Sequence, residues 1–326
     1  MKRLDSQSSE LRQSEHCSER DGYHRSTGTC EGLVTIIQID RPLTVRVLLE
    51  HATAVLSRAG VPDPDVDAQL LLGHVLGASR GQVQAFTFTD APVSADDAIA
   101  IAEVIERRAG REPLQHITGT TGFRSLELAV GPGVFVPRPE TEFVAGLAID
   151  SLRSMADESP LAVDLGTGSG AIALSLATEV PHARVVAVEN SSPAFIWAKQ
   201  NFAAVDARNA RLVFIDLAVA LPELDGLVSV VVSNPPYIPA GAIPRDPEVR
   251  LFDPEHALYG GEDGLDVVRS VSQTARRLLR AGGALVIEHG ELQGAEIREL
   301  LASDGWNATA THRDLTGRDR ATTALR

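Results

Sequence analysis

Between residues 161 and 233 the sequence alternates short apolar runs with longer segments that favour helices. The apolar runs are LAVDLG, RVVAVE, RLVFID and LVSVVVS, and the first three are separated by GAIALSLATE and SPAFIWAKQNF. This alternation favours a mostly parallel, doubly wound sheet of the α/β class. Because ligands of such sheets bind beyond the carboxyl ends of the strands, the residues that follow each apolar run are the first candidates for a functional site.

Three segments before this region carry apolar residues at helical spacing. LTVRVLLEHATAVLSRAG stops at Gly60, and PDPDVDAQLLLGHVLG follows an acidic start marked by prolines. SADDAIAIAEVIERRAG begins with Ser94 as the expected N-cap and ends at Gly110. We expect a small helical bundle whose inward-facing residues are Leu48, Ala52, Val55, Leu56, Ala68, Leu71, Leu72, Val75, Ile101, Val104 and Ile105.

From Pro113 the pattern changes to short strand-like runs. These are ITGTTGF, SLELAVGP and VFVPRP, and they predict a β-hairpin between the bundle and the helical run AGLAIDSLRSM. The first 40 or so residues are polar, mixed in charge and without sustained periodicity. We therefore expect a disordered tail over residues 1–40.

Composition limits the classes of function. The chain has 326 residues and 44% apolar content, enough for a sizeable core. Cys17 and Cys30 both fall in the polar N-terminal stretch, so we expect no disulfide framework, no metal site and a reducing, cytoplasmic location. No apolar run approaches the roughly 20 residues of a membrane span, and the N-terminus has no signal-peptide pattern. The net charge of -14 argues against broad capture of nucleic acid, although a small basic patch is compatible with it.

The first chemical signal is a glycine loop, VDLGTGSGAIAL. A strand leads into Gly166, Gly168 and Gly170 and then into a helix, so backbone can approach a ligand where the helix begins. Glu189 closes the next strand, where a carboxylate could accept hydrogen bonds from ribose hydroxyls. This pair of signals is ambiguous, because Gly166, Gly168 and Ala171 also satisfy the dinucleotide pattern and Glu189 would serve NAD equally well. A glycine turn that only packs helix against strand is the structural alternative.

Asp164, just before the glycines, favours one ligand over the other. Its carboxylate would suit a ligand with an ammonium group, such as the methionine part of S-adenosylmethionine, and would repel a pyrophosphate. The alternative role is to order the glycine loop through backbone hydrogen bonds. The two roles are compatible.

The second signal is NPPY, which follows the strand VSVVVS. Two prolines lack N–H groups and stop the sheet ladder, leaving a rigid corner rich in acceptors. An NH2 group on a carbonyl or aromatic ring is a poor nucleophile, because its lone pair is delocalised. If the Asn234 side-chain oxygen and the Pro235 carbonyl each accept one N–H, the lone pair points at a methyl donor and positive charge on nitrogen is stabilised. Pro236 contributes no competing donor, and Tyr237 would shield the flat group from water. A plain Pro-Pro turn is the bland alternative.

The glycine loop and NPPY together resemble the class I S-adenosylmethionine-dependent amino methyltransferases. Their substrates are exocyclic amines of adenine or cytosine and the side-chain amide of glutamine. PRPETE, preceded by EPLQHITGTTGF, resembles the segment ahead of the catalytic domain in the HemK-type release factor glutamine methyltransferases. Further matches are DPEHALYGGEDGLD, IEHGELQ and DLTGRDR, so the resemblance covers roughly residues 43–326.

The resemblance implies a fold, a reaction and a partner. The implied fold has a helical substrate-recognition domain (41–112), a hairpin linker (113–142) and a Rossmann-like class I methyltransferase domain (143–326). The implied reaction transfers a methyl group from S-adenosyl-L-methionine to the side-chain amide nitrogen (N5) of the glutamine in the Gly-Gly-Gln motif of peptide chain release factors. No membrane or direct nucleic-acid partner is expected.

By position, the resemblance also implies site residues. The donor-binding residues are Asp164, Gly166, Thr167, Gly168, Ser169, Gly170, Glu189, Asp216, Leu217 and Asn234, with Asp216 and Leu217 near the adenine. Catalysis and glutamine binding fall to Asn234, Pro235, Pro236 and Tyr237, with Phe123 bordering the glutamine pocket. Two departures could alter donor affinity, since the family usually has Asp at the position of Glu189 and often an acidic residue at that of Ser229.

Other functions share part of this pattern. A ribosomal-protein glutamine methyltransferase typically differs after Pro-Arg, and a DNA adenine N6 methyltransferase normally adds a basic recognition region. An NAD-dependent oxidoreductase would keep the glycine loop and leave NPPY without a role. Arg138 and Glu140 fit either the site entrance or a hairpin salt bridge. For Glu288 a structural role is favoured, and GRDR near the C-terminus would either steer an acidic partner or pair with the acidic surface.

Overall fold

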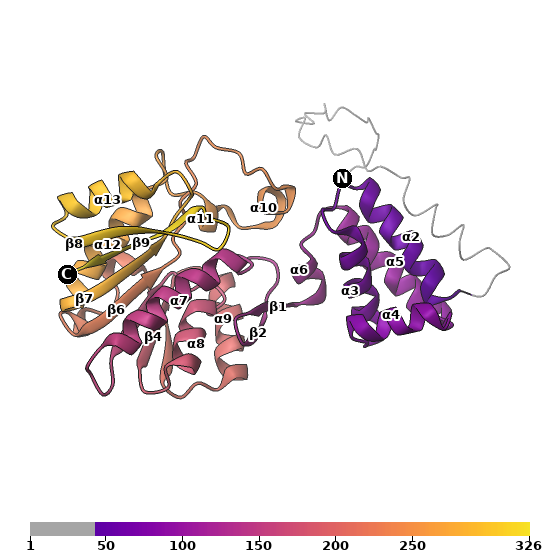
Figure 1. Ribbon diagram of the computed structural model, residues 1–326, viewed down its shortest axis with the longest axis horizontal. Helices are drawn as coiled ribbons and strands as arrows, with labels where there is room; N and C mark the ends of the chain where they lie inside the picture. The colour runs from indigo at the N-terminus through magenta and orange to yellow at the C-terminus, as the bar shows by residue number, and fades with distance from the viewer. Residues whose placement is uncertain (1–42) are drawn as a thin grey trace, which may run out of the picture. The chain divides into compact units, whose positions relative to one another are not determined.

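The computed structural model describes residues 43–326 (Figure 1). The predicted disordered tail, Cys17 and Cys30 lie outside these residues. The N-terminal part is helical, and its helices are α2 (Val45–Arg58), α3 (Pro64–Leu76), α4 (Arg80–Phe88), α5 (Ala95–Ala109) and the short α6 (Leu114–Thr118).

The sequence predicts three of these helices, α2, α3 and α5, and the structure adds α4 and the short α6, which overlaps the start of the predicted strand-like run ITGTTGF. Ser94 caps α5 as expected, since its hydroxyl accepts the N–H of Asp97 at 3.0 Å. In α4, Ser79 and Gln82 form a reciprocal capping box, yet Val83 is the one buried residue of the helix, so no apolar stripe marks it in the sequence. The predicted core positions are buried or half-buried: Leu48, Ala52, Val55, Leu56, Ala68, Leu71, Leu72, Val75, Ile101, Val104 and Ile105.

Two of the three strand-like runs pair as the predicted hairpin. Strand β1 (Thr120–Phe123) is antiparallel to β2 (Leu126–Ala129). The third run, VFVPRP, forms no strand, which corrects that expectation. Val134 and Val136 are buried, and Val134 packs against Ala194 and Trp197. The apolar alternation of this run therefore reflects burial of a loop under α9 (Ser192–Val205) rather than sheet pairing.

A seven-stranded sheet organises the rest of the described chain and confirms the doubly wound prediction. Its order is β5 (Ala210–Phe214), β4 (Arg184–Glu189), β3 (Leu161–Leu165), β6 (Val228–Ser233), β7 (Leu279–Glu288), β9 (Asp319–Leu325), β8 (Asn307–Arg313). Strand β9 is antiparallel to both of its neighbours, and the other ladders are parallel. The chain winds outward from β3 to β5 and then returns to β6, so the topological switch point lies between β3 and β6. A ligand crevice is expected there.

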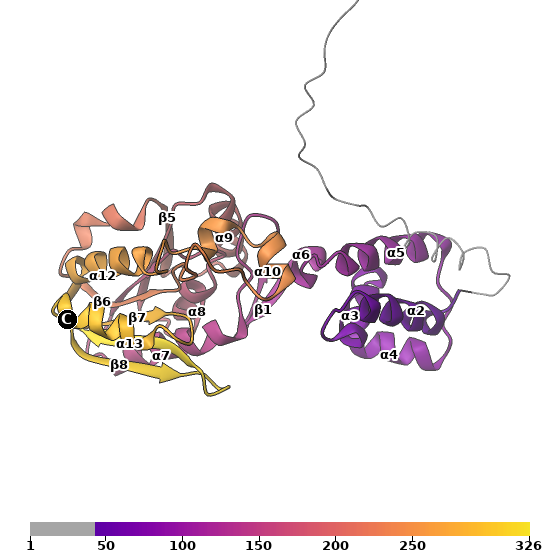
Figure 2. The ribbon, with the colours of Figure 1, turned by 90° about the horizontal axis from the view of Figure 1, so that it is seen from above.

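Helices cover both faces of this sheet (Figures 1 and 2). One apolar cluster joins the sheet to α7 (Pro139–Ser154), α8 (Ala171–Glu179) and α9, and a second joins it to α12 (Asp266–Leu278) and α13 (Gly294–Ser303). The remaining elements are η1 (Leu217–Val219), η2 (Pro222–Leu224), α10 (Pro247–Phe252) and α11 (Glu255–Leu258). None of the helices within residues 43–326 is both long and apolar enough to cross a membrane.

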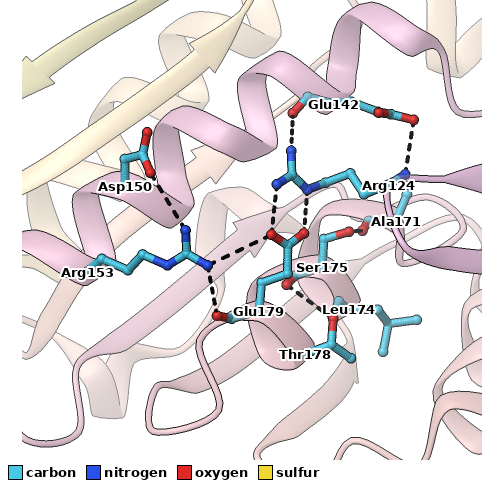
Figure 3. Close-up of polar contacts among 9 residues, drawn as sticks. All are labelled: Arg124, Glu142, Asp150, Arg153, Ala171, Leu174, Ser175, Thr178 and Glu179. Atoms are coloured by element: carbon cyan, nitrogen blue, oxygen red, sulfur yellow. Dashed lines mark hydrogen bonds and ion pairs between the residues drawn. The ribbon is translucent and has the colours of Figure 1, made fainter.

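A polar network fixes the hairpin against α7 and α8 (Figure 3). The Arg124 guanidinium forms a two-pronged pair with the Glu179 carboxylate, and its Nη2 donates to Glu179 Oε2 at 2.8 Å. The backbone N–H of Arg124 donates to Glu142 Oε1 at 3.0 Å. Arg153 Nη2 donates to the Glu179 carbonyl at 3.2 Å. The network therefore ties three elements together at one partly exposed point.

Candidate active site

A cavity of about 720 Å³ opens at the switch point of the sheet. Its lining includes the glycine loop after β3, Glu189 at the end of β4, Asn234 to Tyr237 after β6, and Glu288 at the end of β7. The Ser233 hydroxyl donates to the Leu165 carbonyl at 2.6 Å, which ties the end of β6 to the end of β3. The two sequence signals therefore share one crevice, as their places after parallel strands predict.

The glycine loop adopts a backbone that requires glycine. Gly166, Gly168 and Gly170 have φ angles of 77°, 59° and 89°, in the left-handed region that side chains disfavour. Added Cβ atoms at Gly166 and Gly168 would meet no atom within 4 Å, so this backbone presents open space to the cavity. Gly170 is the N-cap of α8. The loop thus forms a cradle that ends at a helix N-terminus.

Glu189 joins the glycine loop to the end of β4. Its Oε2 accepts the N–H of Gly168 at 2.8 Å, and its Oε1 accepts the N–H groups of Asn190 and Ser191 at 3.0 and 2.8 Å. A carboxylate offers about four acceptor sites. Three of them hold backbone here, which leaves room for one further donor from the cavity.

Asp164 lies beneath the loop and does not line the cavity. Its Oδ2 accepts from the Thr167 hydroxyl at 2.6 Å and from the Ala173 N–H at 3.1 Å. Burial raises the pKa of this carboxyl to about 7, against the two hydrogen bonds that lower it. These contacts are those of a loop-ordering residue, and its role in binding an ammonium group stays a prediction.

The NPPY corner is braced from behind. Gln293 Nε2 donates to the Tyr237 carbonyl at 2.9 Å. A Cβ at Gly260 would lie 2.5 Å from the Pro236 carbonyl oxygen, and one at Gly264 would clash with the Tyr237 carbonyl oxygen. The YGGEDGLD segment therefore needs glycines so that its backbone can pack against the corner.

The Asn234 side chain is oriented by α7. Its Nδ2 donates to Thr141 Oγ1 at 3.3 Å, and no donor within residues 43–326 contacts its Oδ1. The side-chain oxygen is thus the end of the amide available to a ligand. Beside it, burial raises the pKa of the Tyr237 hydroxyl above its usual value, so Tyr237 stays protonated at neutral pH.

A buried carboxylate, Glu288, closes the same wall of the cavity. The side chain is 2% exposed, and its Oε2 has no hydrogen-bond partner among the described residues. Burial raises its pKa to about 7, while the Thr141 hydroxyl and then the charge of Arg320 act in the opposite direction. A carboxyl with this pKa, facing a cavity, is typical of functional sites.

Comparisons with known proteins identify the family. Residues 47–119 match the PrmC N-terminal domain, and residues 126–252 match the methyltransferase small domain. The release factor glutamine methyltransferase of Streptomyces coelicolor is 50% identical over 278 residues, which cover 84% of this chain and 95% of that protein. The chain belongs to this family of release factor glutamine methyltransferases. The Mycolicibacterium smegmatis and Deinococcus radiodurans members are 46% and 44% identical over 286 residues each, covering 86% and 87% of this chain and 98% and 99% of theirs.

Most of the predicted site residues of this methyltransferase line one cavity. They are Gly166, Thr167, Gly168, Ser169, Glu189, Leu217, Asn234, Pro235, Pro236 and Tyr237. Asp164, Gly170, Asp216 and Phe123 are not part of the lining. Asp216 Oδ2 accepts from Nδ2 of Asn190, which does line the cavity, at 3.0 Å. Phe123 is 1% exposed and packs in the core, whereas Phe135 lines the cavity, so the position given to Phe123 beside the substrate finds no support.

Arg138 and Glu140 both line the cavity of the methyltransferase, and no salt bridge joins them in the described chain. The Arg138 guanidinium donates instead to Asp253 Oδ2 at 2.7 Å and lies 5.0 Å from the centre of the Phe135 ring. Burial raises the pKa of Asp253 to about 6. The entrance role therefore fits these residues better than a hairpin salt bridge.

The sequence does not predict three residues that position or line the site. Thr141 lies inside PRPETE, yet only its contact with Asn234 reveals its place. Asn201 of α9 is buried, and its Nδ2 donates to the carbonyls of Ser169 and Ala129, tying the glycine loop to the hairpin. Phe135 sits in the loop mistaken for a strand. Within residues 43–326 no group of three or more His, Cys, Asp or Glu could hold a metal ion.

Proposed function

We propose that this protein transfers a methyl group from S-adenosyl-L-methionine to the N5 amide nitrogen of the glutamine in the Gly-Gly-Gln motif of peptide chain release factors. The observation that carries the proposal is the match to release factor glutamine methyltransferases over 84% of the chain, with Asn234 facing the cavity. Release factors work on ribosomes, so we place the enzyme in the cytoplasm. Residues 43–112 are proposed to recognise the protein substrate.

The NPPY corner suits an amide substrate. Asn234 Oδ1 accepts one N–H of the glutamine amide and the Pro235 carbonyl accepts the other, so the nitrogen is held in one orientation. Both acceptors are fixed before the substrate arrives, and they stabilise the positive charge that develops on nitrogen. The methylated nitrogen is strongly acidic and loses its proton to water, so no strong general base is needed. Tyr237 excludes water from one face of the amide.

The open side of the cavity suits the methyl donor. Open space above Gly166 and Gly168 accepts a ligand that a Cβ would exclude. Glu189 keeps one acceptor site for a ribose hydroxyl, and Leu217 offers an apolar surface for the adenine. When bound, S-adenosylmethionine supplies a methyl group on a positively charged sulfur. The carboxylate of Asp164 lies below the loop and contributes negative potential on that side.

The direct test is methyl transfer to a purified bacterial release factor. With enzyme and S-adenosylmethionine, mass spectrometry should find one added methyl group on the Gly-Gly-Gln peptide, on the glutamine side chain. A release factor with that glutamine replaced by glutamate should gain none. Parallel reactions with labelled donor on DNA and on ribosomal proteins test the rival substrates. Label on either of these, with none on the release factor, would overturn the substrate assignment.

A further inference from the structure

The two ends of the Asn234 amide have opposite chemistry. The oxygen accepts hydrogen bonds and the nitrogen donates them. A substrate NH2 group can only donate, so the corner holds it only when Oδ1 faces the cavity. Something in the protein must therefore fix which end points outward.

Thr141 is the contact that makes this choice. It is 4% exposed, and its Oγ1 accepts from Asn234 Nδ2 at 3.3 Å. A hydroxyl has one proton to donate and can also accept. If Thr141 accepts from Asn234, its own proton must go to another acceptor, and if its proton pointed to Asn234 the amide would be reversed.

Glu288 determines the direction of the Thr141 proton. Thr141 and Glu288 are both buried in the lining of the same cavity, and a side-chain hydrogen bond with Thr141 is among the causes that lower the Glu288 pKa. An ionised carboxylate can only accept, so Thr141 must donate to it and must accept from Asn234. The two hydrogen bonds then have a single direction. Asn234 Nδ2 donates to Thr141, and the Thr141 hydroxyl donates to Glu288.

We propose that Glu288 and Thr141 are positioning residues that fix the polarity of the Asn234 amide, so that its oxygen faces the substrate nitrogen. This inference rests on the proposed function and deepens it. Neither residue needs to touch the reacting atoms. Protonation of Glu288 gives the chain a second direction, in which Glu288 donates to Thr141 and Thr141 donates to Asn234 Oδ1. The Asn234 amide then presents its NH2 group to the substrate NH2 group. Because both groups are donors, the substrate nitrogen is no longer held in the orientation that catalysis needs.

The charges around Glu288 keep this switch near neutral pH. Arg320 of β9 favours the ionised form, and Glu140 of α7 opposes it. Tyr237 of the NPPY corner interacts electrostatically with Glu288, and the charge of Arg138 also acts on Tyr237. Burial is the largest influence and raises the Glu288 pKa to about 7. Both directions of the hydrogen bonds between Glu288, Thr141 and Asn234 are thus accessible between pH 6 and pH 8.

The first experiment removes the relay at Thr141. Thr141→Val keeps the shape and removes the hydroxyl, whereas Thr141→Ser keeps the hydroxyl. We expect Thr141→Val to lower kcat on release factor about 10-fold to 100-fold, in the range of a lost catalytic hydrogen bond, with KM for S-adenosylmethionine within about twofold of wild type. Thr141→Ser should restore most of kcat. Thr178→Val is the matched control, because the Thr178 hydroxyl on α8 donates to the carbonyls of Leu174 and Ser175 at 2.9 and 3.3 Å and does not line the cavity. Its kcat should equal that of wild type.

The second experiment is the pH profile of kcat. Wild type and Thr141→Ser should lose about tenfold in kcat between pH 8 and pH 6, as expected for one group with the Glu288 pKa. Glu288→Gln, which does not titrate, and Thr141→Val, which has no relay, should both lack this acid limb. Asp164 has a similarly raised pKa but no contact with Thr141, so a limb that came from Asp164 would persist in both variants.

The outcomes separate the two proposals. Wild-type kcat in Thr141→Val, or an acid limb that survives in both variants, would overturn the inference and leave the proposed function standing. A wild-type enzyme that methylates no release factor would overturn the proposed function instead. If a variant fails to fold, the Asn234 side-chain NH2 resonances of wild type still decide. They should titrate with the Glu288 carboxyl in NMR spectra, and resonances that do not shift between pH 6 and pH 8 would overturn the inference.

Discussion

Thr141 and Glu142 are neighbours on α7, yet they belong to two polar clusters of opposite character. Glu142 faces the hairpin and joins the partly exposed network around Glu179 (Figure 3). Thr141 is buried, faces the cavity and lies between Asn234 and Glu288. One turn of helix thus serves the scaffold with one side chain and the site with the next.

The carboxylates of the two clusters respond to folding in opposite ways. The hydrogen bond from Arg124 lowers the pKa of Glu179, so folding favours its charged form. Burial raises the pKa of Glu288 to about 7, so folding disfavours its charged form. A carboxylate that stabilises the fold needs no further explanation. Glu288 differs, because its charge destabilises the fold at neutral pH. A carboxylate of this kind points to a functional role.

The largest expected effect is on the site side, at Asn234. Asn234→Ala should lower kcat by about two orders of magnitude or more, because it removes an acceptor that stabilises charge in the transition state. The dissociation constant of S-adenosylhomocysteine, measured by calorimetry, should stay within about twofold. Asn209→Ala is a matched control, since Asn209 Nδ2 donates to the carbonyls of Ala177 and Ala183 and only connects scaffold elements. It should lower the melting temperature and leave kcat unchanged. An unaltered kcat in Asn234→Ala would remove this side chain from the mechanism.

Glu288→Gln should make the protein more stable at pH 8. The folded-state pKa of about 7 is above the usual value for Glu, so the folded protein binds a proton that the unfolded chain releases. The stability that protonated Glu288 contributes is therefore lost as the pH rises from the usual pKa of 4.5 through the folded-state value of about 7. We expect Glu288→Gln to exceed wild type by on the order of 2 kcal/mol in urea unfolding at pH 8, with the difference vanishing near pH 4. A variant that is less stable than wild type at pH 8 would make Glu288 a scaffold residue.

Local patterns in the sequence predict most of the fold. The alternating runs predict the parallel strands β3, β4 and β6 because these strands are buried on both faces and read as continuous apolar segments, whereas the edge strand β5 is only partly buried. Two expectations differ from the structure for the same reason. Helix α4 buries one residue, Val83, and so lacks a stripe, whereas the buried loop around Val134 has a strand-like alternation without a partner strand. Periodicity reports burial, and burial does not always come with regular hydrogen bonding.

The site is predictable only where its residues follow strands. Asn234 and Glu189 could be placed because the carboxyl ends of parallel strands share one edge. Thr141 lies in the first turn of α7, and its contact with Asn234 depends on how that helix packs against β6. Phe135 lies in the loop before α7 and lines the same cavity. The place of Phe123 in the sequence does not reveal where its side chain points, since the hairpin turns its ring into the core. Which side chain of PRPETE faces the cavity is decided by tertiary packing.

The smallest effect belongs to the scaffold cluster and has the opposite sign to that of Glu288. Glu179→Gln weakens the pair with Arg124 and should destabilise the fold by about 1 kcal/mol at pH 7, the upper range for a partly exposed pair. Because the pKa of Glu179 is lowered on folding, this stabilisation is present above its usual pKa and is lost as the pH falls through the folded value. In urea unfolding, the free energy of unfolding of wild type should therefore exceed that of Glu179→Gln at pH 7 and equal it in acid. The kcat of the variant should stay unchanged. A loss of kcat in Glu179→Gln would mean that the hairpin network also positions the site, and the contrast between Glu142 and Thr141 would not hold.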